Sequence, residues 1–275
     1  MPYEEAFMEL KDVSVTYSGP LPGQLHHVLN PLNLQVNEGE LICLLGPSGC
    51  GKTTLLNCIA GFQTYEGTIT LQGQRITKPG KERGVVFQDY ALFPWFTVEQ
   101  NVALGPKMNG LPKAKRSSLT EHCLRLVGLE SFASYYPNRL SGGMKQRASL
   151  ARALANEPSI LLMDEPFAAL DEQTRETMQS ELLEIKRKSG ITCLFITHSI
   201  SEAVYLADRI LVLLPRPGRV ALDLTLDLPH IRDRNDDRLF RYQKLIRSVL
   251  REEPPAHGES KPSNQILEPI LASYR

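Results

Sequence analysis

The sequence predicts an α/β fold in which a mainly parallel central sheet is joined by an antiparallel β subdomain and an inserted helical subdomain. Two segments, 8–17 and 67–72, alternate apolar and polar residues, which is typical of antiparallel strands with one solvent-facing side. Continuous apolar runs indicate parallel strands covered on both faces, and they occupy residues 41–45, 159–163, 192–197 and 210–214. Helical patterns separate these runs, as an α/β order requires.

The helices expected next to these strands have recognisable ends. Residues 52–60 form a helical pattern that Gly61 closes. A longer pattern at 172–188 has three basic residues in its last turn and Gly190 behind it. Both ends are typical of helix C-termini, so these two helices are predicted with defined boundaries.

The helical subdomain is predicted at about 90–156, where strand signals vanish and helical patterns dominate. One of its helices is expected at 118–127, stopped by Gly128. The C-terminal residues 229–275 are interpreted as an extension that is partly flexible. Within it, the segment 253–264 is polar and proline-rich, which favours a flexible tail.

Composition describes an ordinary globular chain of 275 residues, of which 42% are hydrophobic. Lys plus Arg and Asp plus Glu both total 31, so no basic excess favours nucleic acid as a partner. The first residues lack a signal-peptide pattern and no apolar run reaches membrane-spanning length, so the chain itself is expected to be soluble and cytoplasmic. Its five cysteines form no C-x-x-C pair and are interpreted as reduced structural thiols, with Cys50 as an oxidation-sensitive exception.

The strongest chemical motif is the loop at 46–53, which follows the apolar run 41–45 and opens the helix at 52–60. Its Gly-x-x-x-x-Gly-Lys-Thr pattern is that of a P-loop, whose glycines let backbone N–H groups curl around phosphate oxygens. Lys52 is placed to reach the outer phosphates, and the Thr53 hydroxyl is placed to ligate magnesium. The predicted nucleotide contacts are Gly46, Pro47, Ser48, Gly49, Cys50, Gly51, Lys52, Thr53 and Thr54.

A pair of acids, Asp164 and Glu165, follows the apolar run 159–163. Ligands of open α/β sheets collect at the carboxyl ends of strands, so this pair is expected near the phosphate loop. Asp164 would hold magnesium directly or through water, and Glu165 would orient and deprotonate the water that attacks the γ-phosphate. Taken alone, two acids after a strand would be a solvated loop.

A second anion-type element is Ser141-Gly142-Gly143, where a serine in N-cap position precedes an amphipathic helix. By itself this pattern is only a helix cap. The chain has a single P-loop, at 46–53, and this second anion-type element lies far along the sequence. The pattern suggests that the two elements must come together to form one site.

The motifs together resemble the ATP-binding subunits of ATP-binding-cassette (ABC) transporters over roughly residues 8–225. Residues 140–147 are similar to the signature sequence of that family, residues 160–166 to its Walker B strand, and residues 168–171 to its D-loop. The resemblance further assigns the Q-loop glutamine, the switch histidine and the adenine-stacking aromatic, which are Gln88, His198 and Tyr17.

The resemblance implies a head-to-tail dimer in which ATP on the loop of one subunit is capped by Ser141, Gly142 and Gly143 of the other. It implies ATP and Mg²⁺ as ligands, with Asp171 at the nucleotide. Catalytic roles fall to Glu165, His198, Gln88 and Lys52, and metal contacts to Thr53, Gln88 and Asp164. The ATP-binding domain is expected at 1–228. Met144 replaces the usual glutamine of the signature, and we expect this to tune the site without abolishing it.

The aromatic segment 89–96, which includes Trp95 around a proline, is open to two interpretations. It is either ordinary core or a partner-binding surface. In the family this region lies where coupling helices of the membrane subunits dock.

The lack of a fused transmembrane domain is typical of a separate importer ATPase, with two transmembrane permease subunits and a solute-binding protein as partners. Such a subunit works peripherally at the cytoplasmic face of the inner membrane. Segments 78–88, 92–95 and 214–220 are similar to the nitrate, sulfonate and taurine group, most of all to taurine import ATPases. Nitrate, cyanate or another small solute remains the alternative.

A non-transport ABC ATPase acting on nucleic acid or ribosomes is the rival from another class. Repair relatives carry long coiled coils between the halves of the cassette and translation relatives carry two cassettes, and neither feature is in this sequence. A small-molecule kinase would share the P-loop but has no use for residues 140–147.

Overall fold

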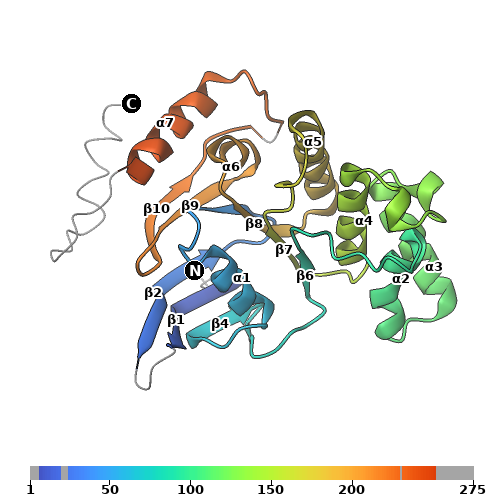
Figure 1. Ribbon diagram of the computed structural model, residues 1–275, viewed down its shortest axis with the longest axis horizontal. Coiled ribbons are helices and arrows are strands. Elements are labelled where there is room, and N and C mark those ends of the chain that lie inside the picture. The colour runs from blue at the N-terminus through green and yellow to red at the C-terminus, as the bar shows by residue number, and fades with distance from the viewer. Residues whose placement is uncertain (1–5, 20–23, 230, 252–275) are drawn as a thin grey trace, which may run out of the picture.

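A computed structural model describes residues 6–19, 24–229 and 231–251 of the chain, and shows a six-stranded and a four-stranded sheet with helices around them (Figure 1). The predicted α/β fold is confirmed. The expected flexible tail at 253–264 and the first five residues lie outside the described residues.

The six-stranded sheet has the order β10-β9-β3-β8-β7-β6, and all of its pairs except β9–β10 are parallel. The four predicted apolar runs each form one of its strands. Its strands are β3 (Leu41–Leu45), β6 (Arg83–Val86), β7 (Ile160–Asp164), β8 (Thr192–Thr197), β9 (Arg209–Leu214) and β10 (Arg219–Thr225).

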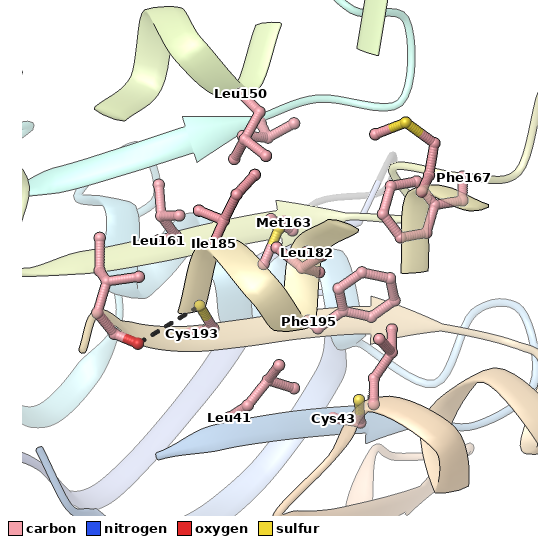
Figure 2. Close-up of a cluster of buried hydrophobic side chains, with 14 of the residues drawn as sticks. Leu41, Cys43, Leu150, Leu161, Met163, Phe167, Leu182, Ile185, Cys193 and Phe195 are labelled. Carbon is pink, nitrogen blue, oxygen red and sulfur yellow. Dashed lines mark hydrogen bonds between the residues drawn. The ribbon is translucent and has the colours of Figure 1, made fainter. Parts of the chain in front are cut away.

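Successive residues of the buried strands point to opposite faces of this sheet and build two separate cores. On one face, Leu41 and Cys43 of β3 and Phe195 of β8 pack with helices α4 (Gly142–Leu154) and α5 (Glu172–Ser189), as Figure 2 shows. On the other face, Ile42 and Leu194 pack with helix α1 (Lys52–Ala60) and the second sheet. The parallel sheet is therefore covered on both sides, as its continuous apolar runs predict.

The second sheet is antiparallel with the order β2-β1-β4-β5, which confirms the predicted antiparallel subdomain. Its strands are β1 (Met8–Ser18), β2 (Leu25–Val36), β4 (Glu66–Leu71) and β5 (Gln74–Arg75). The sequence reasoning missed β2 because this strand contains Pro31 and pairs with β1 in a register that shifts three times. Only its second half alternates buried and exposed residues.

The helix ends agree with their predicted stop signals. Gly61 and Gly190 follow α1 and α5 with φ of 81° and 67°, the left-handed conformation that glycine adopts without a steric cost. At Gly61 a Cβ would lie 2.4 Å from the carbonyl group of Lys78, so the close approach of the backbone also requires glycine.

The region predicted as helical holds no strand among its described residues. It contains α2 (Val98–Met108), α3 (Lys113–Leu126), two short 3₁₀ turns at Glu130–Phe132 and Pro137–Arg139, and α4. Helix α3 begins five residues before the expected 118, after Pro112, whose fixed φ suits a helix start. Figure 1 places α2 and α3 at one end of the molecule, away from the antiparallel sheet.

The chain after β10 adds a helix that the sequence reasoning did not predict. This helix, α7 (Asp237–Arg251), packs against α6 (Ile200–Leu206) and β9. Its Leu239 and Ile246 are buried in the same core as α4 and α5. Residues 237–251 of the C-terminal extension therefore belong to the packed body of the protein.

Candidate functional site

Four segments with chemically active residues follow the carboxyl ends of strands in the central sheet. The P-loop follows β3, His198 follows β8, Asp164 ends β7 with Glu165 behind it, and Gln88 follows β6. These strands are consecutive neighbours in the order β3-β8-β7-β6 and run in parallel, so their carboxyl ends lie side by side. The sheet thus assembles in space a site whose parts span more than a hundred residues of sequence.

The P-loop is open on its outer side. Gly49 and Gly51 have φ of 77° and 93°, and a Cβ at Gly49 would meet no atom within 4 Å. The Lys52 side chain is 6% exposed, and its ammonium donates to the carbonyl oxygens of Gly46 at 2.8 Å and of Pro47 at 3.1 Å. A cation is therefore held inside a curled backbone that is bare of side chains at Gly49, which suits an anionic ligand.

Gly46 and Gly51 are required by packing around this loop. A Cβ at Gly46 would lie 2.3 Å from the carbonyl oxygen of Leu213, and one at Gly51 would lie 2.4 Å from the Leu29 side chain of β2. The antiparallel sheet therefore supports the loop from beneath.

The expectation that Cys50 is oxidation-sensitive is not supported by its surroundings. Its thiol is buried against Gly46, and burial raises the pKa of Cys50 although Lys52 acts in the opposite direction. The protonated, buried thiol is a poor nucleophile. The interpretation of the other cysteines as structural thiols agrees with their burial, which raises the pKa of Cys58 and Cys193 to about 12.

We expect all five thiols of the folded chain to resist modification by DTNB at neutral pH, and to react together once denaturant is added. The reason is that each thiol is buried and none has a lowered pKa. Absorbance of the released thionitrobenzoate measures the reaction. One rapidly reacting thiol in the native protein, lost on the substitution Cys50→Ser, would show instead that the loop thiol is accessible.

Thr53 and Asp164 face each other at the start of α1 and the end of β7. The Thr53 hydroxyl donates to Oδ1 of Asp164 at 3.2 Å. Burial raises the pKa of Asp164, the charge of Glu165 acts in the same direction, and Thr53 and Lys52 lower it. A hydroxyl and a carboxylate are the oxygen ligands that Mg²⁺ prefers, and a bound cation would offset the cost of this buried charge.

The substitution Asp164→Asn should raise the thermal unfolding midpoint of the ligand-free chain at pH 7.5 by a few degrees, on the scale of small stability changes in a domain of this size. Folding raises the pKa of the Asp164 carboxyl, so its ionised form destabilises the folded chain. This destabilisation grows as the pH rises through the folded-state pKa. The asparagine removes this destabilisation and can still accept from Thr53. Calorimetry at several pH values tests this, with Asp89→Asn at an exposed position as control. A gain that does not shrink as the pH falls to about 4, the ordinary pKa of an aspartate carboxyl, would contradict the explanation.

Glu165 and His198 meet between the ends of β7 and β8. Nδ1 of His198 lies 3.2 Å from Oε2 of Glu165. Glu165 has φ of 44°, which is uncommon for a residue with a side chain, and its N–H donates to the carbonyl oxygen of Ile196. A cavity of about 50 Å³ adjoins the pair. Glu165 and His198 are thus in contact where the carboxyl ends of β7 and β8 lie side by side.

A buried network behind this pair was missed by the sequence reasoning. Glu202 accepts from the hydroxyl of Thr197, which directly precedes His198, and from Nε2 of Gln179 at 3.0 Å. Gln179 in turn accepts from Arg234 at 3.0 Å, so the network reaches the chain after β10. No local motif marks these residues, and only their burial side by side reveals the network.

Gln88 and Tyr17 are both exposed to solvent. Gln88 is exposed at the end of β6, on the same edge as Asp164. Tyr17 lies on β1 opposite His26 of β2 and is 39% exposed. It belongs to the sheet that supports the P-loop.

The second anion-type element does not reach the P-loop of the same chain. Ser141 caps α4 by accepting from the N–H of Met144 at 3.3 Å, and Gly143 lies close to Thr174 of α5. Asp171 caps α5 by accepting from the N–H of Thr174 at 3.0 Å. Figure 1 shows α4 well separated from α1. The cap uses the backbone of Met144, while its side chain packs on the core, so replacing the usual glutamine leaves the cap intact.

The aromatic segment 89–96 forms a surface in part. Phe93 contacts Trp95 and Phe96 with ring centroids 5.6 and 5.8 Å apart, and Trp95 is 66% exposed. Phe87, directly after β6, stacks on Phe62, which follows α1, with ring centroids 6.4 Å apart, and both residues are exposed. Trp95 therefore lies on the surface, and the interpretation of the segment as ordinary core is wrong for this residue.

The fold and the site define a P-loop ATPase of the ATP-binding-cassette type. A family model described as "ABC transporter" matches residues 29–168. The chain belongs to this family, whose ATP-binding proteins hydrolyse ATP to energise transport. The resemblance to ABC ATP-binding subunits that the sequence motifs indicate is thereby confirmed.

Three curated relatives show which proteins the chain resembles. It is 47% identical to an uncharacterized ABC transporter ATP-binding protein of Methanocaldococcus jannaschii, over 90% of this chain and 92% of that one. It is 43% identical to the nitrate import ATP-binding protein NrtD of Synechocystis sp., over 89% and 95%. It is 48% identical to the taurine import ATP-binding protein TauB of Roseobacter denitrificans, over 78% and 80%.

Among solved structures, the chain is similar to the ATP-binding cassette MJ0796 in a dimeric post-hydrolysis state bound to ADP and Pi. The TM-score is 0.69 at 33% identity, covering 81% of this chain and 100% of that one. The predicted ABC ATPase fold is therefore confirmed. In the described part of the chain, no helix combines the length and apolar character needed to cross a membrane.

Proposed function

We propose that this chain is the ATP-hydrolysing subunit of an ABC importer that takes up a small anionic solute, taurine or another sulfonate. The observation that supports the ATPase chemistry best is the meeting of the P-loop, Asp164, Glu165 and His198 at adjacent strand ends. The import role rests on relatives named as taurine and nitrate import ATP-binding proteins.

Residues 46–54 would cradle the phosphates of ATP, with Lys52 as the cation inside the loop. Thr53 and Asp164, with Gln88 from the neighbouring strand end, would hold Mg²⁺. The described residues contain no group of three or more His, Cys, Asp or Glu that could hold a metal alone, which fits an ion shared with phosphate oxygens. When bound, Mg²⁺ would neutralise charge on those oxygens.

Glu165 would accept a proton from the attacking water, because its carboxylate lies at the strand-end edge one residue beyond the metal ligand Asp164. His198, 3.2 Å from Glu165, would orient that carboxylate and contact the γ-phosphate. Tyr17 would stack on adenine from the antiparallel sheet.

The second half of each ATP site would come from a second copy of this chain. Ser141, Gly142 and Gly143 sit at a helix N-terminus that the P-loop of the same chain does not meet, and a helix start with free N–H groups favours phosphate. Asp171 caps the neighbouring helix and would lie at the same interface. The similar cassette MJ0796 is dimeric, which supports a head-to-tail homodimer.

Two transmembrane permease subunits and a solute-binding protein would complete the importer, with this chain at the cytoplasmic face of the inner membrane. The exposed aromatics around Trp95 are the surface we assign to the permeases. Closing of the dimer on ATP would move this surface and turn the permeases outward. Nitrate is the second candidate solute, because the nitrate relative aligns over more of both chains than the taurine relative does.

A pull-down of the tagged chain from its native membranes, followed by mass spectrometry, tests the importer. We expect a multi-span permease and a solute-binding protein, and calorimetry of that binding protein with taurine and with nitrate then identifies the solute. Recovery of only ribosomal or DNA-associated proteins would overturn the transport proposal and leave the ATPase intact.

A further inference from the structure

A relay of hydrogen bonds connects the C-terminal extension to the turn that carries His198. It runs from Arg234, which lies between β10 and α7, through Gln179 of α5 to Glu202 of α6, and it ends at Thr197, the last residue of β8. The three inner members are buried, while the Arg234 side chain is 34% exposed. The relay therefore leads from the surface of the extension to the strand-end edge, and no role assigned above uses Arg234.

The inner end of the relay ties down the turn on both sides of His198. The Thr197 hydroxyl donates to Glu202 and accepts from the N–H of Ser199 at 2.9 Å. The Ser199 hydroxyl in turn caps α6 by accepting from the N–H of Glu202 at 3.3 Å. The His198 side chain is itself 64% exposed and lies 3.2 Å from Glu165. The direction of its ring therefore depends on the backbone of this turn.

Arg234 fixes which way the Gln179 amide faces. An arginine side chain can only donate hydrogen bonds, so Oε1 of Gln179 faces Arg234, 3.0 Å from Nη2. The amide nitrogen then faces Glu202 and donates to its Oε1 at 3.0 Å. With the amide reversed, its oxygen would meet the carboxylate, and two acceptors would be in contact in a buried place. The pairing of Glu202 thus depends on Arg234.

Glu202 needs these donors because its carboxylate is buried. Burial raises the pKa of Glu202, while the hydrogen bonds from Thr197 and Gln179 and the charges of Arg175 and His198 act in the opposite direction. A buried carboxylate that loses a donor must move toward water or take up a proton. Either change alters its bond to the Thr197 hydroxyl, and so disturbs the turn at His198.

Arg234 is held in a defined place at the outer end of the relay. Its guanidinium lies over the ring of Tyr205 in α6, 3.8 Å from the ring centroid. Nη2 also donates to the carbonyl oxygen of Glu176 in α5 at 3.0 Å, and Nη1 lies 3.6 Å from the carboxylate of the same residue. These contacts place the extension across α5 and α6, the two helices that carry the middle of the relay.

We propose that Arg234 is a positioning residue for ATP hydrolysis, which holds His198 against Glu165 through Gln179 and Glu202. Small displacements of a group at a reaction centre can cost much of the rate, so the C-terminal extension sets the speed of hydrolysis. ATP binding at the P-loop does not need the relay. Because Arg234 acts through His198, its role rests on the proposed function of the Glu165–His198 pair.

Steady-state ATP hydrolysis by the full chain with Arg234→Met tests this role. Methionine keeps an unbranched side chain over Tyr205 but cannot donate to Gln179. We expect kcat to fall by about three- to tenfold and KM for ATP to stay within about twofold of the wild type. The matched control is Arg238→Met, which removes an arginine of the same extension that pairs with Asp236 instead. It should hydrolyse ATP at the wild-type rate.

Gln179→Met breaks the relay one step further in, and it covers the case in which Arg234→Met impairs folding. It should lower kcat as much as Arg234→Met does, and the double variant should be no slower than either single variant, because both remove the same link. Arg234→Lys keeps a charged donor and should return kcat to within about twofold of the wild type. Fully additive losses, or an equal loss in Arg238→Met, would show a general loss of stability and contradict the proposal.

The ring of His198 reports the positioning without any turnover. In protein with ¹⁵N-labelled histidine, the ring signals that disappear in His198→Gln belong to this residue. We expect them to shift in Arg234→Met and in Gln179→Met, and to stay unchanged in Arg238→Met. If His198→Gln hydrolyses ATP at the wild-type rate, the proposed role of His198 is wrong. If His198→Gln is slow while Arg234→Met keeps the wild-type kcat and ring signals, only the role of Arg234 is wrong.

Discussion

Glu165→Gln should reduce ATP turnover by about a thousandfold while leaving ATP binding within a few-fold of the wild type. Glutamine keeps the size of the side chain and can still contact His198, but it cannot take a proton from water. Lys52, Thr53 and Asp164 remain in place, so the contacts expected for phosphate and metal are unchanged. Phosphate release measures turnover, equilibrium binding of a fluorescent ATP analogue measures affinity, and gel filtration with ATP measures dimer formation.

Glu121→Gln is the matched control, because Glu121 is an exposed glutamate of α3, far from the strand-end edge. It should hydrolyse ATP at the wild-type rate. If Glu165→Gln also turns over at nearly this rate, then Glu165 is not the base. A variant that no longer binds ATP would instead assign Glu165 to nucleotide binding.

Lys52→Ala should weaken ATP binding by about 10- to 100-fold, since it removes a charged hydrogen-bond donor from inside the loop. The ammonium is held by the carbonyl oxygens of Gly46 and Pro47. Its loss therefore removes the positive charge and also frees two carbonyl groups toward the phosphate. Calorimetric titration with Mg-ATP measures the loss of affinity.

Lys81→Ala, at an exposed lysine before β6, controls for the loss of one positive charge from the surface. The unfolding midpoint of each variant shows whether the loop has collapsed. If a folded Lys52→Ala protein binds ATP as tightly as the wild type, then Lys52 does not bind the phosphates. An equal loss in Lys81→Ala would point to overall charge as the cause.

Much of the fold was predictable because the local pattern of the chain is strong. The runs at 41–45 and 192–197 coincide with β3 and β8, and 52–60 coincides with α1. β2 and β10 were missed, since β2 carries a proline and a shifting register, and β10 is only partly buried. Helix α7 was missed although the sequence carries a signal for it. Leu239, Leu245 and Ile246 recur at helical spacing between charged residues.

The predicted site residues divide according to what the structure brings together. Thr53 with Asp164, and Glu165 with His198, are in contact, as their predicted roles require. The roles themselves remain predictions until the variants are measured. Glu202 behind His198 was not predicted, because a buried carboxylate in a network leaves no local pattern in the sequence.

By itself, the sequence determined the chemistry of each loop: the P-loop glycines, the acid pair and the serine cap depend on a few contiguous residues and the backbone conformations they allow. Only the tertiary structure decided which loops meet. The strand order places His198 between the P-loop and Glu165, and the packing of α4 against α5 keeps the Ser141 cap beside α5. Strand neighbours are set by pairing and packing between distant segments, and no local pattern encodes that choice.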